Sequence, residues 1–323
     1  MKKKKRFLTS LSVFVGLAMM CAAGLLLSAV AARQASPPAS PAISAERLDD
    51  RIIVRVNGET FTCYRFGAGQ KYPYFYPVNG PASGRSVTTE SSLPWPHHRS
   101  LFFGCDKVNG GNYWQEGNEL GQIVSKGASV SKSGPDFIRI RDDCEWRQPG
   151  QAPIIADQRD IRIEAPARGL RLIDFGIALT ALTDIKIERS NHALFSARVE
   201  PELSVTGGGM LVNAEGASSE KGTYGVASAW CDYSGKHCGL AEGIAIFDSP
   251  SNPWFPCKWF TRDYGFFSPT PMEWLGPEGY RLKKGETLQL RYRVVVHAGD
   301  ASQADIGGLF KQYKSAYSGT GIK

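Results

Sequence analysis

The chain has 323 residues and a formal net charge of +7. Five of these positive charges belong to Lys2–Lys5 and Arg6, so the rest of the chain carries a net charge of only +2. No dense Lys/Arg patch remains outside this cluster, which argues against nucleic acid as a partner.

The N-terminal segment has the pattern of a targeting sequence. Its basic residues precede an apolar run from Phe7 to about Ala32 that closes on the small residues SAVAA, as secretory signals do. The run could also span a bilayer, which takes about 20 apolar residues, so an uncleaved anchor at residues 7–32 is an alternative. We therefore expect an exported chain, periplasmic, at the cell surface or secreted, with no membrane contact beyond such an anchor.

The remainder divides into a linker and one domain. Residues 33–47 are rich in Pro, Ala and Ser and are predicted to be a linker after the leader at 1–32. Residues 48–323 contain no internal linker and no short repeat. All-β domains can reach about 250 residues, so this part is predicted to be a single domain.

The domain opens on a predicted hairpin. Two strand-like runs, RIIVRV at 51–56 and ETFTCYRF at 59–66, flank the pair Asn57-Gly58. Asn-Gly between such runs is typical of a tight β-hairpin, because both turn residues need a positive φ.

Strand patterns also dominate the rest of the domain. Alternating apolar residues occur at 160–165, 169–182, 184–190 and 286–299. The one convincing helical pattern is at 300–317, where the apolar residues have helical spacing and Asp300 or Ser302 could cap the helix. The sequence predicts a mostly β fold, a large antiparallel β-sandwich with a short C-terminal helix.

Cysteine usage favours disulfides. An even number of cysteines in an oxidising compartment indicates disulfide pairing, and Cys231 and Cys238 could close a small loop. No CxxC pair occurs, so a structural zinc site is not expected. The cysteines after the leader are Cys63, Cys105, Cys144, Cys231, Cys238 and Cys257.

Over about residues 50–315 the chain resembles the PmoA-like domain family, exported bacterial proteins labelled after a methane oxygenase subunit. Seven blocks carry the resemblance in the same order: YPYFYPVNGPASGRSVT, PHHRSLFFG, VNGGNYWQE, LIDFGIALTA, GVASAWCDYSG, GIAIFDSPSNP and KWFTRDYGFFSPTP. The oxygenase subunit of that name spans the membrane several times, whereas this chain has at most one span. A metal-dependent oxygenase is therefore a distant alternative.

A looser resemblance is to galactose-mutarotase-like proteins. It rests on IDFGIALTALTDIKIERSNHALF, which includes His192, and on the late strand LRYRVVVHAG. The resemblance implies a β-supersandwich whose concave face holds sugars, and hence a carbohydrate or glycan as substrate.

The segment LPWPHHRS holds the first candidates for chemistry. In an extended strand His97 and His98 would point to opposite sides, but Pro94 and Pro96 favour a loop in which the two rings can converge. A histidine acts as acid or base near neutral pH. The PmoA-like resemblance also indicates that this pair is functional, although backbone hydrogen bonding is the alternative reading.

Carboxylates and aromatic rings supply the other candidates. Glu116 follows Trp114 in NYWQEG, Asp232 shares a strand face with Trp230, and KWFTRDYG offers a ring to stack on sugar and a guanidinium to hold oxygens. Each could instead be a turn or core residue. The predicted catalytic residues are His97, His98, Asp232 and Glu116, and the predicted substrate-binding residues are Arg99, Trp114, Trp230, Trp259 and Arg262.

These residues favour a sugar-processing enzyme of hydrolase, lyase or epimerase type. A histidine and a carboxylate would act as general acid and base. The alternative is a non-catalytic glycan-binding protein of the cell envelope. No cofactor is predicted; a divalent metal at His97 and His98 stays open, although nothing in their spacing shows one.

Overall fold

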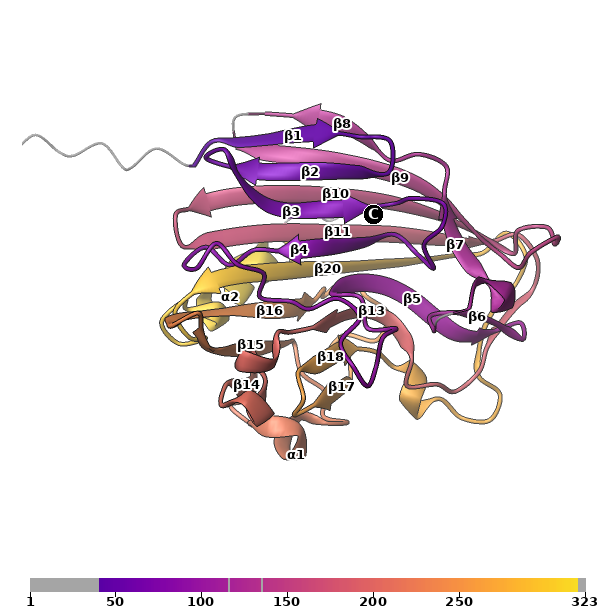
Figure 1. The fold of residues 1–323 in the computed structure, drawn as a ribbon. Helices are drawn as coiled ribbons and strands as arrows, with labels where there is room; N and C mark the ends of the chain where they lie inside the picture. The colour runs from indigo at the N-terminus through magenta and orange to yellow at the C-terminus, as the bar shows by residue number, and fades with distance from the viewer. Residues whose placement is uncertain (1–40, 116, 135, 319–323) are drawn as a thin grey trace, which may run out of the picture. The chain divides into compact units, whose positions relative to one another are not determined.

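Two antiparallel β-sheets pack face to face in the described part of the chain (Figure 1). The computed structural model describes residues 41–115, 117–134 and 136–318, so the predicted leader and most of the predicted linker lie outside the described residues. Within that part, the first sheet has 11 strands and the second has nine. The expected mostly β sandwich with a C-terminal helix is confirmed.

The first sheet has the spatial order β1-β2-β3-β4-β5-β13-β18-β17, with β6, β12 and β19 paired beside it. Its strands are β1 Ile43–Arg47, β2 Arg51–Val56, β3 Glu59–Arg65, β4 Tyr74–Val78, β5 Leu101–Val108, β6 Gly111–Tyr113, β12 Ile185–Ile187, β13 Ala193–Arg198, β17 Trp259–Arg262, β18 Phe266–Pro269 and β19 Tyr280–Leu282.

The second sheet has the order β14-β15-β16-β20-β11-β10-β9-β7, with β8 paired to β9. Its strands are β7 Gln122–Ser125, β8 Ser129–Ser133, β9 Phe137–Arg147, β10 Ile155–Ala167, β11 Leu170–Ala181, β14 Met210–Asn213, β15 Trp230–His237, β16 Leu240–Asp248 and β20 Thr287–Ala298.

The helices are short and lie between or after the strands. They are the α-helices α1 Ser219–Thr223 and α2 Ile306–Ser318 and the 3₁₀ helices η1 Asn118–Leu120, η2 Pro201–Leu203, η3 Val205–Gly207 and η4 Met272–Trp274. Among the described residues, none of the helices has the length and apolar character needed to cross a membrane.

The main core lies between the sheets. Alternation along β20 buries Leu288, Leu290, Tyr292, Val294 and Val296, the face predicted from the sequence. These side chains meet those of the first sheet, as the stacked rings of Tyr292 and Phe195 show, with centroids 4.9 Å apart.

Helix α2 covers the outer face of the second sheet. Ile306, Phe310 and Tyr313 pack there against Phe247 and its neighbours in a second, smaller apolar cluster. The helix begins after Asp305, whose Oδ1 accepts a hydrogen bond from the Gly308 amide. The predicted caps stand in the preceding turn instead, so the helix starts several residues later than expected.

The predicted hairpin is present as β2 and β3. Asn57 and Gly58 have φ values of 52° and 83°, the positive values that this turn requires. The expected linker also holds a strand: β1 lies inside it, where Ile43 pairs with Val56 and is 8% exposed. Burial of this one apolar side chain and edge pairing with β2 outweigh the linker-like composition around it.

The six cysteines of the described part are free thiols, so the disulfide expectation is not supported. Cys231 is near the start of β15 and Cys238 follows its end. Seven residues of extended strand separate their Cα atoms by about 23 Å, whereas a disulfide requires less than about 7 Å. The expectation of a small disulfide-closed loop between them was wrong, because the segment is one continuous strand.

Candidate functional site

The histidine pair lies in a tightly folded loop between β4 and β5. The Trp95 amide donates to the Ser92 carbonyl at 3.0 Å, and the His98 amide donates to the Trp95 carbonyl at 3.1 Å. The Tyr72 hydroxyl holds the loop by donating to the His97 carbonyl at 2.7 Å. These turns bend the chain, so the rings of His97 and His98 converge, with centroids 4.5 Å apart.

The segment before β13 brings in a third histidine. The ring of His192 meets that of His97 edge-on at 5.3 Å, and its Nδ1 lies 3.9 Å from Asp106 Oδ2. The Asp106 amide also donates to the His192 carbonyl at 2.8 Å, which fixes the segment beside β5. We call His97, His98 and His192 the histidine cluster.

Aromatic rings surround the histidine cluster. Phe266 of β18 stacks on His98 at 4.3 Å, and Trp114, which is fully buried, lies 5.7 Å from His192. Trp95 lies 6.1 Å from His97 and is 41% exposed, so it forms the outer edge. The cluster therefore combines polar ring nitrogens with largely apolar walls.

Arg198, at the end of β13, is the residue that sequence reasoning missed. It is only 5% exposed, its guanidinium lies 4.4 Å over the Tyr264 ring, and burial lowers its pKa. Within the described residues, its Nε and Nη1 have no hydrogen-bond partner, and the same holds for Trp114 Nε1 and His98 Nδ1. The sequence feature that could have identified Arg198 is its position as the one arginine at the end of the apolar strand ALFSAR.

All these groups lie on the outer face of the first sheet. Phe195 of β13 points inward against Tyr292, so Arg198, three residues later, points outward. Arg198 stands opposite Phe266 in the ladder between β13 and β18, and Phe266 contacts His98. The loop that carries the histidine pair therefore covers this face of the sheet.

The pKa of His98 is lowered to about 2. Burial is the main cause, and the positive charge that His97, Arg198 and His192 can carry lowers it further. His98 is therefore neutral near pH 7 and serves as a hydrogen-bonding group. The positive surroundings that keep a proton off this ring would attract an anion.

A polar hollow adjoins the cluster at His192. Its volume is about 440 Å³, in the range of small-ligand sites. It is lined by Asp106, Lys107, Gln115, Arg189, Ser190, Asn191, His192 and Glu273.

Asp232, the predicted catalytic acid, lies elsewhere. It is fully buried in β15 and accepts a hydrogen bond from His297 Nε2 at 2.7 Å. Tyr233, the next residue, points into the main core, and Asp232 stands opposite Ala245 of the cluster under α2. Asp232 thus faces the outer side of the second sheet, and the main core separates it from the histidine cluster.

The tryptophans predicted to bind substrate are likewise distributed between the histidine cluster and other parts of the fold. Trp114 belongs to the walls of the histidine cluster. Trp230 packs in the apolar cluster near α2. Trp259 is a core residue whose Nε1 donates to the Ser228 carbonyl at 2.8 Å.

The predicted arginines lie at the margin of the site. Arg99 is 4.0 Å from Glu90 at the base of the loop. Arg262 is on the outer face of the first sheet, where it contacts Glu220 at 3.2 Å and the Phe260 ring at 4.0 Å. Both already have partners. The prediction for Glu116 lies outside the described residues.

The residues most compatible with a metal are not His97 and His98, where a divalent metal had been left open. Among the described residues, the group of three potential ligands whose atoms all lie within 4.8 Å of one another is Glu202, His237 and Cys238. The histidine cluster does not meet that criterion, so the geometry places a candidate metal centre away from His97 and His98.

Comparisons with known proteins give a family and distant structural similarities. The model of DUF6807, described as a family of unknown function, matches residues 51–311. No curated protein gives a significant match.

Three solved structures align with most of this chain. A galactose mutarotase related enzyme from Lactobacillus acidophilus is 7% identical, with a TM-score of 0.31, over 80% of this chain and 98% of its own. A proposed aldose 1-epimerase from Klebsiella pneumoniae is 10% identical, with a TM-score of 0.38, over 82% and 81%. A polysaccharide lyase is 10% identical, with a TM-score of 0.28, over 82% of this chain and 34% of its own.

Proposed function

The chain belongs to DUF6807, a family of unknown function, and we propose that it is an exported carbohydrate-active protein that binds an acidic sugar at the histidine cluster and Arg198. The leader predicted at residues 1–32 supports export. The aromatic walls and the polar hollow beside His192 support a sugar, because rings cover sugar faces while polar side chains hold the hydroxyl groups.

The observation that carries the proposal is the buried guanidinium of Arg198. A buried charge is costly unless a partner of opposite charge or several hydrogen bonds compensate it. Two of its nitrogens have no hydrogen-bond partner among the described residues. A planar guanidinium binds a carboxylate with two parallel hydrogen bonds, so a sugar carboxylate is the ligand that fits it.

The same arrangement supports proton transfer at carbon. When Arg198 neutralises the sugar carboxylate, the adjacent C–H bond becomes more acidic, and His97 can take its proton. The electron pair left on carbon then either takes a proton from water on the opposite face, which is epimerisation, or expels the oxygen substituent on the next carbon, which is β-elimination. In β-elimination that oxygen leaves with a proton from water, because neutral His98 is a poor acid.

Binding without turnover is the second candidate. It is favoured by the pKa of His98, which at about 2 makes this ring a poor base. Under this reading, the histidine cluster contributes only hydrogen bonds and the protein is a glycan-binding component of the cell envelope.

Incubation with polyuronates and with neutral glycans separates the two candidates. If the protein is an enzyme, unsaturated or epimerised sugars should form from the acidic glycans alone. Ultraviolet absorbance and NMR detect these products. The His97→Gln variant should then lose product formation while keeping affinity for the substrate.

Two arginine variants serve as a matched pair. Arg198→Gln should lose affinity, whereas Arg141→Gln, which changes an exposed arginine of β9, should not. Equal affinity of Arg198→Gln and wild type for acidic glycans would contradict the proposed role of Arg198. If acidic glycans bind but no product forms, the protein is a non-catalytic glycan-binding protein.

A further inference from the structure

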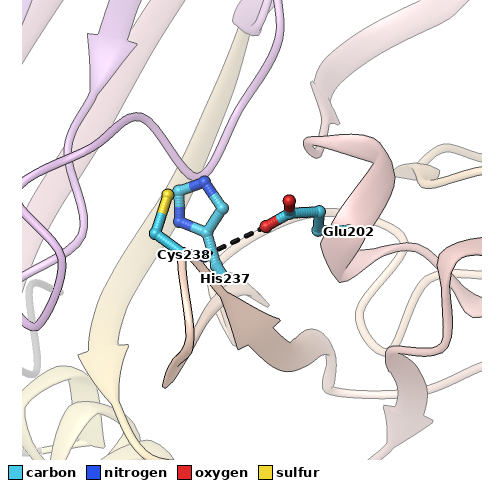
Figure 2. Close-up of side chains that lie close together, drawn as sticks. All are labelled: Glu202, His237 and Cys238. Atoms are coloured by element: carbon cyan, nitrogen blue, oxygen red, sulfur yellow. Dashed lines mark hydrogen bonds between the residues drawn. The ribbon is translucent and has the colours of Figure 1, made fainter.

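Three side chains at the far end of β15 form a site independent of the histidine cluster. His237 is the last residue of β15, and Cys238 and Gly239, with φ values of 50° and 83°, make the tight turn into β16. Glu202 comes from η2, which follows β13. Figure 2 shows the three side chains together, with the Cys238 amide donating to Glu202 Oε2 at 3.0 Å.

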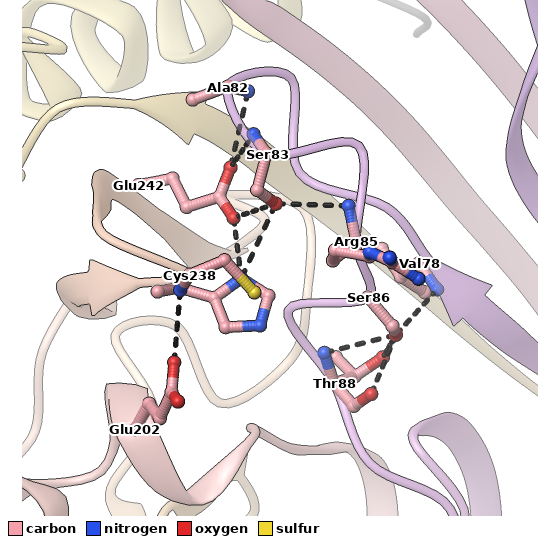
Figure 3. A network of polar contacts seen from close by, with 10 residues as sticks. Val78, Ala82, Ser83, Arg85, Ser86, Thr88, Glu202, Cys238 and Glu242 are labelled. Carbon is pink, nitrogen blue, oxygen red and sulfur yellow. Dashed lines mark hydrogen bonds and ion pairs between the residues drawn. The ribbon is translucent and has the colours of Figure 1, made fainter.

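The orientation of His237 is set by a buried carboxylate. Glu242 of β16 is fully buried, and it accepts hydrogen bonds from the Ala82 and Ser83 amides at 3.2 and 3.1 Å and from the Ser83 hydroxyl (Figure 3). His237 Nδ1 lies 2.6 Å from Glu242 Oε1. A Cβ on Gly80 would come within 2.1 Å of Glu242, so the glycine lets the loop close over this carboxylate.

This contact determines which ring nitrogen carries the hydrogen. A carboxylate only accepts, so His237 Nδ1 must donate to it. The neutral ring then presents the lone pair of Nε2. A carboxylate that holds one ring nitrogen while the other binds a metal is the usual arrangement of metal-ligating histidines.

The remaining ligands complete a set suited to zinc. Cys238 and Glu202 are exposed, and their ligand atoms lie within 4.8 Å of each other and of one ring nitrogen of His237. A tetrahedral zinc ion spaces its ligand atoms about 3.3–3.8 Å apart. Rotation of the two exposed side chains can close that difference.

The types of ligand favour the same ion. Thiolate and imidazole select zinc over magnesium or calcium, which prefer oxygen ligands. We propose that Glu202, His237 and Cys238 bind one Zn²⁺ ion, with the fourth coordination position open and Glu242 holding His237 in place.

Calorimetric titration of the full chain, reduced and stripped of metal with a chelator, tests the proposal with Zn²⁺ itself. One equivalent should bind. Cys238→Ser and Glu202→Gln should each weaken binding at least tenfold. Because both side chains are exposed, neither change should prevent folding. Glu215→Gln removes an exposed carboxylate outside the site and should bind as wild type does.

Glu242, the carboxylate that orients His237, gives a prediction of the size of the loss in zinc affinity. Loss of a group that orients a metal-ligating histidine costs about 10–100-fold in metal affinity. Glu242→Gln should therefore weaken binding by that factor, provided that its circular dichroism spectrum matches wild type.

Cobalt provides a direct signature of the thiolate. With Co²⁺ in place of Zn²⁺, wild type should show a thiolate-to-cobalt charge-transfer band in the near ultraviolet. The band should disappear in Cys238→Ser and persist in Cys63→Ser. Wild type without a zinc isotherm, or Cys238→Ser with unchanged affinity and band, would overturn the proposal.

Discussion

Burial of His98 beside other positive groups makes the free energy of unfolding depend on pH. Its folded pKa is about 2, against about 6.5 in the unfolded chain. Below about pH 6.5 the unfolded state binds a proton that the folded state does not, so stability falls as the pH falls. His98→Gln should flatten this acid-side loss. Urea unfolding at several pH values measures it, and identical acid-side slopes in both proteins would contradict the burial of His98.

His297 has the opposite effect. Burial lowers its pKa, but the charge and hydrogen bond of Asp232 outweigh burial, and the net shift is upward. The pair therefore adds stability below the unfolded pKa of about 6.5, and this stability is lost as the pH rises through the folded pKa.

Asp232→Asn tests this pair. Breaking a buried ion pair from one side costs about 3–5 kcal/mol, and the variant should also lose the alkaline-side decline in stability. Denaturant unfolding at pH values on both sides of neutrality measures both effects. A variant as stable as wild type at pH 6 would show that the pair contributes nothing.

Individual strands show which patterns the sequence reveals. The hairpin at Asn57-Gly58 and the alternation of β20 were predictable, because turn chemistry and one-sided burial leave periodic signals. The surroundings of β15 were not predictable, because its residues are buried on both faces, by the main core and by the cluster under α2. Alternation correctly placed Trp230 and Asp232 on one face, but it could not tell which layer that face meets.

The site was partly predictable for the same reason. The loop with His97 and His98 was identifiable from its prolines, and Trp114 from its block of sequence. Arg198 and His192 reach the cluster only because β5, β13 and β18 are neighbours in the first sheet. No local sequence pattern reveals this spatial order. Pairing of distant strands decides which side chains meet.

Helix α2 should contribute strongly to stability through its contact with the second sheet. Phe310 packs edge-on against Phe247 with ring centroids 5.4 Å apart. Phe310→Ala should cost about 3 kcal/mol, the value for removing a buried aromatic ring. Lys311→Ala, an exposed change on the same helix, is the control. Equal midpoints in thermal unfolding would show that α2 is not needed to cover this face.

The folded chain as a whole relies on its two apolar layers and on no cross-links among the described cysteines. The structure predicts that all six cysteines after residue 40 react with an alkylating reagent in denaturant without prior reduction. In the native protein, the exposed Cys238 should react well before the five buried thiols. Mass spectrometry of the labelled peptides identifies each site, and any pair labelled only after reduction would reveal a disulfide.

Recognition of a sugar carboxylate by Arg198 is most directly tested with one matched pair of ligands. Calorimetry should compare an oligosaccharide of uronic acids with the same oligosaccharide after reduction of its carboxyl groups. We predict that wild type binds the acidic form at least tenfold more tightly and that Arg198→Gln removes the difference. Equal affinity of wild type for both forms would contradict the account.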